Sequence, residues 1–63
     1  MALTDKQRKF AANIAQGMTA SDAARAAGYA DSSPHALCVT ASRLQRHPEV
    51  QQAAFLERER RLN

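Results

Sequence analysis

The sequence predicts an all-α fold, a small four-helix domain that contains a helix-turn-helix. Apolar residues recur at helical spacing, proline and glycine stand where helices start and stop, and no stretch alternates as a strand does. We expect helices over about residues 5–16, 20–27, 34–46 and 48–62. With 63 residues, the chain (residues 1–63) has room for a single domain with a small core.

The first expected helix, residues 5–16, opens with a capping box. Gln7 follows Thr4 at the spacing that lets each side chain reach the other's backbone N–H, and Gly17 is a natural helix stop. The core face is formed by Phe10, Ala11 and Ile14. The opposite face, expected to point to solvent, carries Lys6, Lys9, Asn13 and Gln16.

The second expected helix, residues 20–27, has a face made only of alanine. It begins after Thr19 and stops at Gly28, and its narrow apolar face consists of Ala20, Ala23, Ala24 and Ala27. Because alanine is small, another backbone can approach this face closely. The side chains expected to point away from the core are Ser21, Asp22 and Arg25.

The third expected helix, residues 34–46, starts with Ser33 as N-cap and Pro34 at the first helical position, where its missing N–H costs nothing. Its core stripe is Leu37, Ala41 and Leu44. The opposite face carries His35, Val39, Ser42, Arg43 and Arg46.

The fourth expected helix, residues 48–62, starts at Pro48 and lacks a single apolar stripe. Val50 and Ala54 share one face, whereas Phe55 and Leu56 point away from it. Either the helix frays near its end, or its outer side meets another subunit or a following domain. The last residues, "ERERRLN", contain no helix stop, so we expect an N-terminal fragment of a longer chain.

The turn between the second and third helices favours a helix-turn-helix. Gly28 supplies a left-handed residue, Tyr29 can pack back to close the turn, and caps are offered by Asp31, Ser32 and Ser33. In such a motif the second helix presents one apolar and one polar, reading face. Any compact helical bundle has similar corners, so the geometry alone leaves a structural role open.

The charge distribution points to a polyanionic partner. The formal net charge is +3, and the excess of positive charge falls in residues 1–17 and 32–48, each with two more basic than acidic residues. Arginine can pair with guanine, a hydroxyl with a base or phosphate, and valine with a thymine methyl. We therefore expect DNA contacts from His35, Val39, Ser42, Arg43 and Arg46. Supporting phosphate contacts are expected from Lys6, Lys9 and Arg25.

The sequence argues against an enzyme, a metal site or a bound cofactor. Cys38 is the single cysteine, and we expect it to be a small buried residue of a helix. Its pairing with His35 lacks a third orienting group, and there is no glycine-rich phosphate loop. No signal peptide or long apolar run is present, so we expect a soluble, intracellular chain with no membrane partner.

Three segments resemble the N-terminal domain of bacteriophage terminase small subunits: "LTDKQRKF", "TASDAARAAGY" and "SRLQRHPEV". The resemblance covers roughly residues 3–56, and it departs from the family pattern at His35, Cys38 and Gln45. It implies a non-catalytic protein that recognises packaging-site double-stranded viral DNA in the host cytoplasm. It also implies a ring-forming homo-oligomer that delivers DNA to a large subunit carrying the ATPase and nuclease, through regions outside these residues.

Three other interpretations stay open at this point. A transcriptional regulator or transposase-like protein uses the same helix-turn-helix geometry. A protein–protein docking domain would present the same third helix to a partner helix, without salt-sensitive DNA affinity. Finally, DNA in the whole protein would be held mainly by other regions, with this domain at the periphery.

Overall fold

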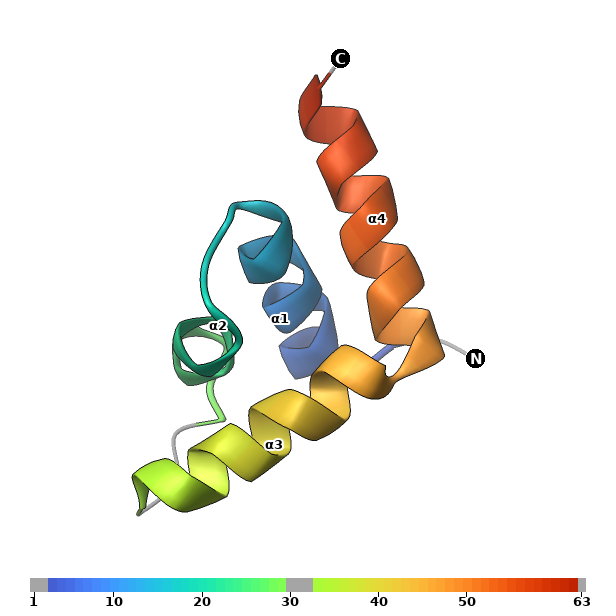
Figure 1. Ribbon diagram of the computed structural model, residues 1–63. Coiled ribbons are helices and arrows are strands. Elements are labelled where there is room, and N and C mark those ends of the chain that lie inside the picture. Colours follow the sequence, from blue (N-terminus) through green and yellow to red (C-terminus); the bar gives the residue numbers. More distant parts are fainter. Residues whose placement is uncertain (1–2, 30–32, 63) are drawn as a thin grey trace.

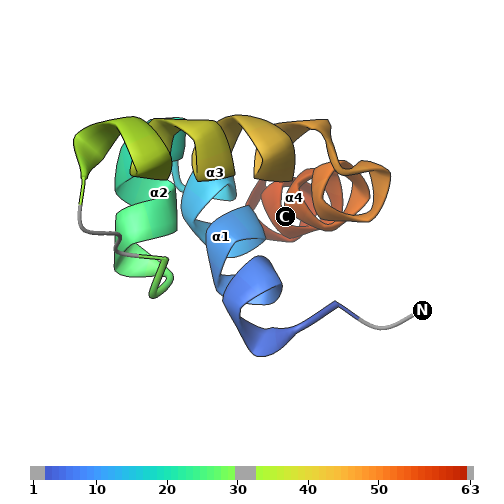
Figure 2. The same cartoon turned by 90° about the horizontal axis from the view of Figure 1, so that it is seen from below.

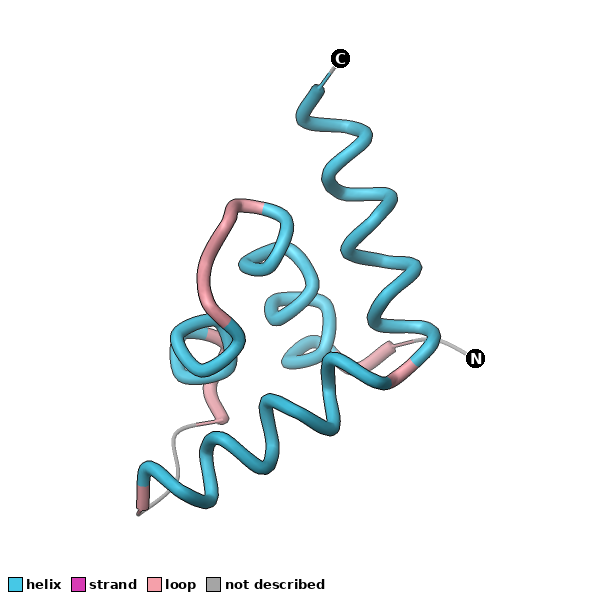
Figure 3. Tube along the Cα trace, in the orientation of Figure 1, coloured by secondary structure: helices cyan, strands magenta, loops and turns pink. Residues whose placement is uncertain are grey.

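Four helices and no strand make up the part of the chain that the computed structural model describes, residues 3–29 and 33–62 (Figures 1 and 3). The helices are α1 (Asp5–Ala15), α2 (Ala20–Ala26), α3 (Pro34–Arg46) and α4 (Pro48–Leu62). The all-α prediction is confirmed. α1 and α2 end one residue earlier than expected, because Gln16 and Ala27 act as their C-caps.

The helix starts follow the expected capping chemistry. The Gln7 N–H donates to Thr4 Oγ1 at 3.1 Å, and the Thr4 N–H donates back to Gln7 Oε1 at 3.0 Å. The hydroxyls of Thr19 and Ser33 each accept the backbone N–H three residues on, at 3.2 and 3.1 Å. Each such cap stabilises the fold by about 1 kcal/mol. Two further candidate caps lie outside the described residues, namely Asp31 and Ser32.

Glycine ends both short helices in the left-handed region, with φ of +98° at Gly17 and +101° at Gly28. After α2, the Gly28 N–H donates to the Arg25 carbonyl at 3.2 Å and the Tyr29 N–H to the Ala24 carbonyl at 3.0 Å. This pair of bonds is the Schellman motif, which satisfies the last carbonyls of a helix. The chain direction leaving α2 is therefore fixed by backbone hydrogen bonds.

α1 lies between α2 and α4, and α3 runs across the same side of all three (Figures 1 and 2). α1 packs against α2 and α4, while α3 packs against α2 and α4 at its two ends. The far half of α4 extends beyond the other helices (Figure 1). α3 consequently forms one edge of the domain.

The core centres on the Phe10 ring, which is fully buried. More than half of the core residues are alanine; the set is Phe10, Ala11, Ala23, Ala24, Ala27, Leu37, Ala41, Leu44 and Val50. The expected core stripe of α3 and the buried alanines of α2 are confirmed. Small side chains let the helix backbones approach closely, so one aromatic ring fills much of the interior.

Two side chains expected to face solvent instead contact neighbouring helices. Asn13 is part-buried, and its Nδ2 donates to the Ala23 carbonyl of α2 at 3.1 Å. Ser21 is half-buried, with its Oγ 3.6 Å from Cys38 Sγ of α3. The prediction for both was wrong because each lies on the flank of its helix that a neighbouring helix approaches.

The expected burial of Cys38 is also wrong, because the residue is exposed. At 100° per residue, Cys38 lies about a quarter turn from the buried Leu37 on α3. That position places the thiol beside α2 rather than beneath it. Cys38 therefore borders the outer surface of α3.

Candidate nucleic-acid interface

The outer face of α3 carries the five side chains expected to contact DNA, and all five are exposed: His35, Val39, Ser42, Arg43 and Arg46. Four of them recur at helical spacing on the side opposite the buried leucines, with Arg43 on the flank. Val39 is a large apolar residue that remains 38% exposed. The face combines cations, a hydroxyl, an imidazole and an apolar contact.

α3 is held rigidly enough to present this face. Leu37, Ala41 and Leu44 anchor it to the core along its length. At its C-terminal end, Gln51 Nε2 of α4 donates to the Gln45 carbonyl at 2.7 Å. The face is therefore supported from beneath and at one end.

The charge of this face is positive and locally uncompensated. α3 contains no acidic residue, and Arg43 and Arg46 lie in its last turn. Neither arginine makes an ion pair within the described part of the chain. Cations near a helix C-terminus are favoured by the helix dipole, so the two arginines also stabilise the helix that carries them.

The three supporting residues lie in three different settings, and the structure does not gather them beside α3. Lys6 Nζ lies 5.6 Å from the centre of the Tyr29 ring, over the turn after α2. Lys9 borders a groove between α1 and α4. Arg25 pairs with Asp22 at 3.1 Å, with both side chains more than half exposed.

The Lys6 contact explains how the turn is closed. Tyr29 is partly buried against the core, as expected, and the aliphatic part of Lys6 lies along Gly28. A lysine ammonium over a tyrosine ring contributes about 0.5–1 kcal/mol where the contact is open to solvent. The side chain thus links the start of α1 to the corner that precedes α3, a role that the sequence pattern did not reveal.

Sequence reasoning also missed Arg8. This exposed side chain lines the groove between α1 and α4, and it makes no ion pair within the described residues. Its neighbours in the "KQRK" run show that the segment is basic. Helical spacing alone could have placed Arg8 away from Lys6, but not beside α4.

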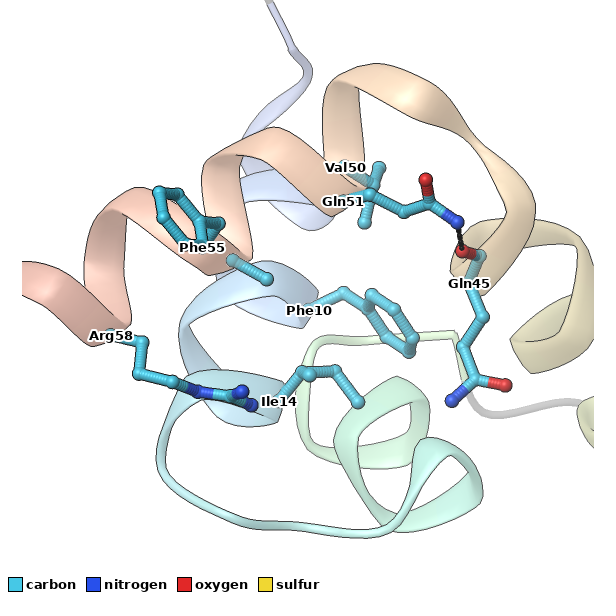
Figure 4. A pocket seen from close by; sticks show the side chains of 8 residues that line it. Phe10, Ile14, Gln45, Val50, Gln51, Phe55 and Arg58 are labelled. Carbon is cyan, nitrogen blue, oxygen red and sulfur yellow. Dashed lines mark hydrogen bonds between the residues drawn. The ribbon is translucent and has the colours of Figure 1, made fainter.

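A second depression, of about 240 Å³, opens between α1, the end of α3 and α4 (Figure 4). Figure 4 shows Phe10 and Ile14 between Gln45 on one side and Arg58 on the other. Phe55 lies on its rim and is 61% exposed. Among the described residues of this lining, Arg58 is the one ionisable group, so they offer no acid–base pair.

Other kinds of site find no support in the described part of the chain. Residues 3–29 and 33–62 contain no cluster of three or more His, Cys, Asp or Glu side chains able to hold a metal ion. Within the same residues, no helix is long and apolar enough to cross a bilayer.

Comparison with known proteins points to one family. The family model described as terminase small subunit matches residues 3–60, which is nearly the whole chain. Searches of curated proteins and of solved structures give no significant match. The family match covers α1, α2, α3 with its exposed face, and all but the last two residues of α4. The chain belongs to the terminase small subunit family.

Proposed function

We propose that this domain binds the packaging-site DNA of a virus through the outer face of α3, and helps to deliver that DNA to the terminase large subunit. Family membership supports a role in genome packaging. The observation that carries the DNA-binding part is the acid-free, exposed face of α3, whose two arginines make no ion pair with any residue of 3–29 and 33–62. In this proposal α2 and α3 act as a helix-turn-helix, with α3 in the major groove.

Each side chain has a distinct role in the proposed complex. Arg43 and Arg46 contact phosphates or guanine edges, Ser42 contacts a base or phosphate, and Val39 contacts a thymine methyl. His35, in the first turn of α3, reaches toward the bases because the N-terminal part of a recognition helix does so in this motif. Supporting phosphate contacts come from Lys6, Lys9 and Arg25.

The domain acts without catalysis in this proposal. The terminase small subunit family is generally non-catalytic, and we propose that the ATPase and nuclease belong to a separate large subunit. We propose that the whole protein works in the host cytoplasm as a ring of identical subunits, and that other regions contact the large subunit. Two arginines give a single domain weak affinity, so several copies bound together would hold the DNA.

The test is a titration of fluorescent packaging-site duplex at several salt concentrations. With roughly three to five phosphate contacts, log K should fall with log salt at a slope of about −2.7 to −4.5. If both arginines contact phosphates, the Arg43→Ala/Arg46→Ala variant should have a slope shallower by about 1.8. With about four contacts, the loss of affinity between about 50 and 200 mM salt then falls from roughly a hundredfold to roughly tenfold. If they contact guanine edges, the variant should lose affinity at every salt concentration with little change in slope.

The matched control is Arg58→Ala/Arg61→Ala, which removes the same charge from exposed positions of α4. Its salt slope should stay within experimental error of the wild type. Unchanged affinity and unchanged salt slope in the α3 variant, or equal changes in both variants, would show that α3 does not carry the DNA contacts.

A further inference from the structure

A groove between α1 and α4 has an apolar floor and a basic border. Its volume is about 530 Å³, and none of its described lining residues belongs to α3. The apolar side chains that line it are Leu3, Ala11, Ala12, Ala53 and Leu56. The charged ones are Arg8, Lys9, Arg60 and Glu57.

The groove extends along α4. A shallower depression of about 220 Å³ shares Leu3, Ala53 and Leu56 with it. Leu56 is 52% exposed although it sits between the two hollows. Known small-ligand sites span about 300–1,000 Å³, so the groove has room for more than one large side chain. A long, open hollow of this kind suits a segment that lies along α4.

The charges around the groove select the sign of its occupant. Glu57 is already paired with Arg60 at 2.9 Å, whereas Arg8 and Lys9 make no ion pair within the described residues. The border of the groove therefore keeps a positive excess beside an apolar floor, whereas the adjoining depression is lined by the acidic Glu49. Carboxylates on an occupant would meet these cations, and the apolar floor would take aliphatic or aromatic side chains.

We propose that the α1–α4 groove binds an acidic amphipathic helix of a partner protein. Amphipathic helices commonly dock by laying their apolar face into a hydrophobic groove. One or two large apolar side chains would contact Leu56 and the alanines of the floor, and flanking Asp or Glu would pair with Arg8 and Lys9. DNA is disfavoured as the occupant, because a phosphate backbone gains nothing from Leu3, Ala53 and Leu56. The inference does not depend on the DNA contacts proposed for α3, and it competes with the supporting phosphate contact proposed for Lys9.

The experiment uses two fluorescent helical peptides with the same leucine face, one flanked by glutamates and the other by lysines. The acidic peptide should bind the wild-type chain, and its affinity should fall with added salt. Leu56→Ala should weaken it at least about tenfold, because a buried anchor typically contributes 1.4 kcal/mol or more. Arg8→Ala should weaken it by up to about fivefold, the range of an exposed ion pair.

Phe55→Ala is the matched control, because Phe55 is an apolar residue of α4 that is at least as exposed as Leu56 and borders the other depression. It should change the affinity by less than about twofold. Both exposed positions can be substituted without opening the core, and circular dichroism checks that the variants fold.

Four results would overturn the proposal. The first is absence of binding by the acidic peptide, and the second is equal binding of both peptides. The third is a loss of affinity for the acidic peptide in Phe55→Ala as large as that in Leu56→Ala. The fourth is a competing occupant, seen as duplex DNA affinity lost in Leu56→Ala, or as self-association of the free chain that Leu56→Ala abolishes in sedimentation.

Discussion

Substituting each of the two left-handed glycines with alanine tests how the corner before α3 is built. Gly17 and Gly28 have nearly the same φ, +98° and +101°. A Cβ on Gly17 would meet no atom within 4 Å, and one on Gly28 would lie 3.5 Å from Lys6 Cε, an ordinary van der Waals contact. The two sites therefore differ in surroundings but share the same backbone strain.

The expected cost is set by that strain. A residue with a Cβ in the left-handed region lowers the free energy of unfolding by about 1–2 kcal/mol. Replacing glycine also reduces the freedom of the unfolded chain, which raises the free energy of unfolding by about 0.4–1 kcal/mol. Gly17→Ala and Gly28→Ala should each lower the free energy of unfolding by about 1 kcal/mol, which corresponds to a Tm lower by roughly 4–8 °C. Thermal unfolding followed by circular dichroism measures both variants.

Equal losses of stability in the two variants would support backbone strain as the cause. A stability loss in Gly28→Ala about 2 kcal/mol larger than in Gly17→Ala would contradict this expectation. It would mean that the Lys6 side chain cannot move aside and is packed more tightly than the 3.5 Å contact implies. Asparagine at either site should lose less than alanine, because Asn enters the left-handed region more readily. A larger loss with Asn than with Ala would contradict the strain argument.

Three further predictions concern the core, a helix contact and the α3 surface. Phe10→Ala should lower the free energy of unfolding by about 3–5 kcal/mol, a large part of a total that is roughly 3–9 kcal/mol; retention of a cooperative transition near the wild-type Tm would refute this. Asn13→Ala should lose only about 0.5–1.5 kcal/mol, because the Ala23 carbonyl keeps the Ala27 N–H at 3.0 Å, and chemical denaturation gives the value. The exposed Cys38 thiol should react more slowly with iodoacetamide when duplex DNA is bound, because α3 would lie in the groove. An unchanged rate under saturating DNA counts against that docking.

Local chemistry made much of the fold predictable from the sequence. Thr4 with Gln7, Thr19, and Ser33 with Pro34 mark helix starts through hydrogen bonds between residues three apart. The positive φ that a helix end requires was equally readable at the two glycines. Such features depend on neighbours in the sequence alone, so they need no knowledge of the tertiary arrangement.

Contacts on helix flanks could not be predicted in the same way. Asn13 lies about 60° around α1 from Phe10 at 100° per residue, on the border between core and solvent. Whether that border is covered depends on where α2 packs, and here the Asn13 amide reaches the Ala23 carbonyl. The same reasoning applies to Ser21 beside Cys38.

In the candidate site, too, some features follow from the sequence and others depend on how the helices pack. Exposure of the five α3 residues follows from helical spacing opposite Leu37 and Leu44, and it is confirmed. The settings of Lys6 and Lys9 depend on the neighbouring Tyr29 and α4, which spacing does not reveal. Contact with DNA involves a second molecule, so it remains a prediction for experiment.

The most direct test of the central claim is a nuclear magnetic resonance titration of the ¹⁵N-labelled chain with packaging-site duplex at low salt. We expect the largest chemical-shift changes on the outer face of α3, at His35, Val39, Ser42, Arg43 and Arg46. Signals from the far half of α4 should stay in place, and added salt should reverse the changes. Shift changes centred on α4 or on the α1–α4 groove, with α3 unaffected, would contradict the claim.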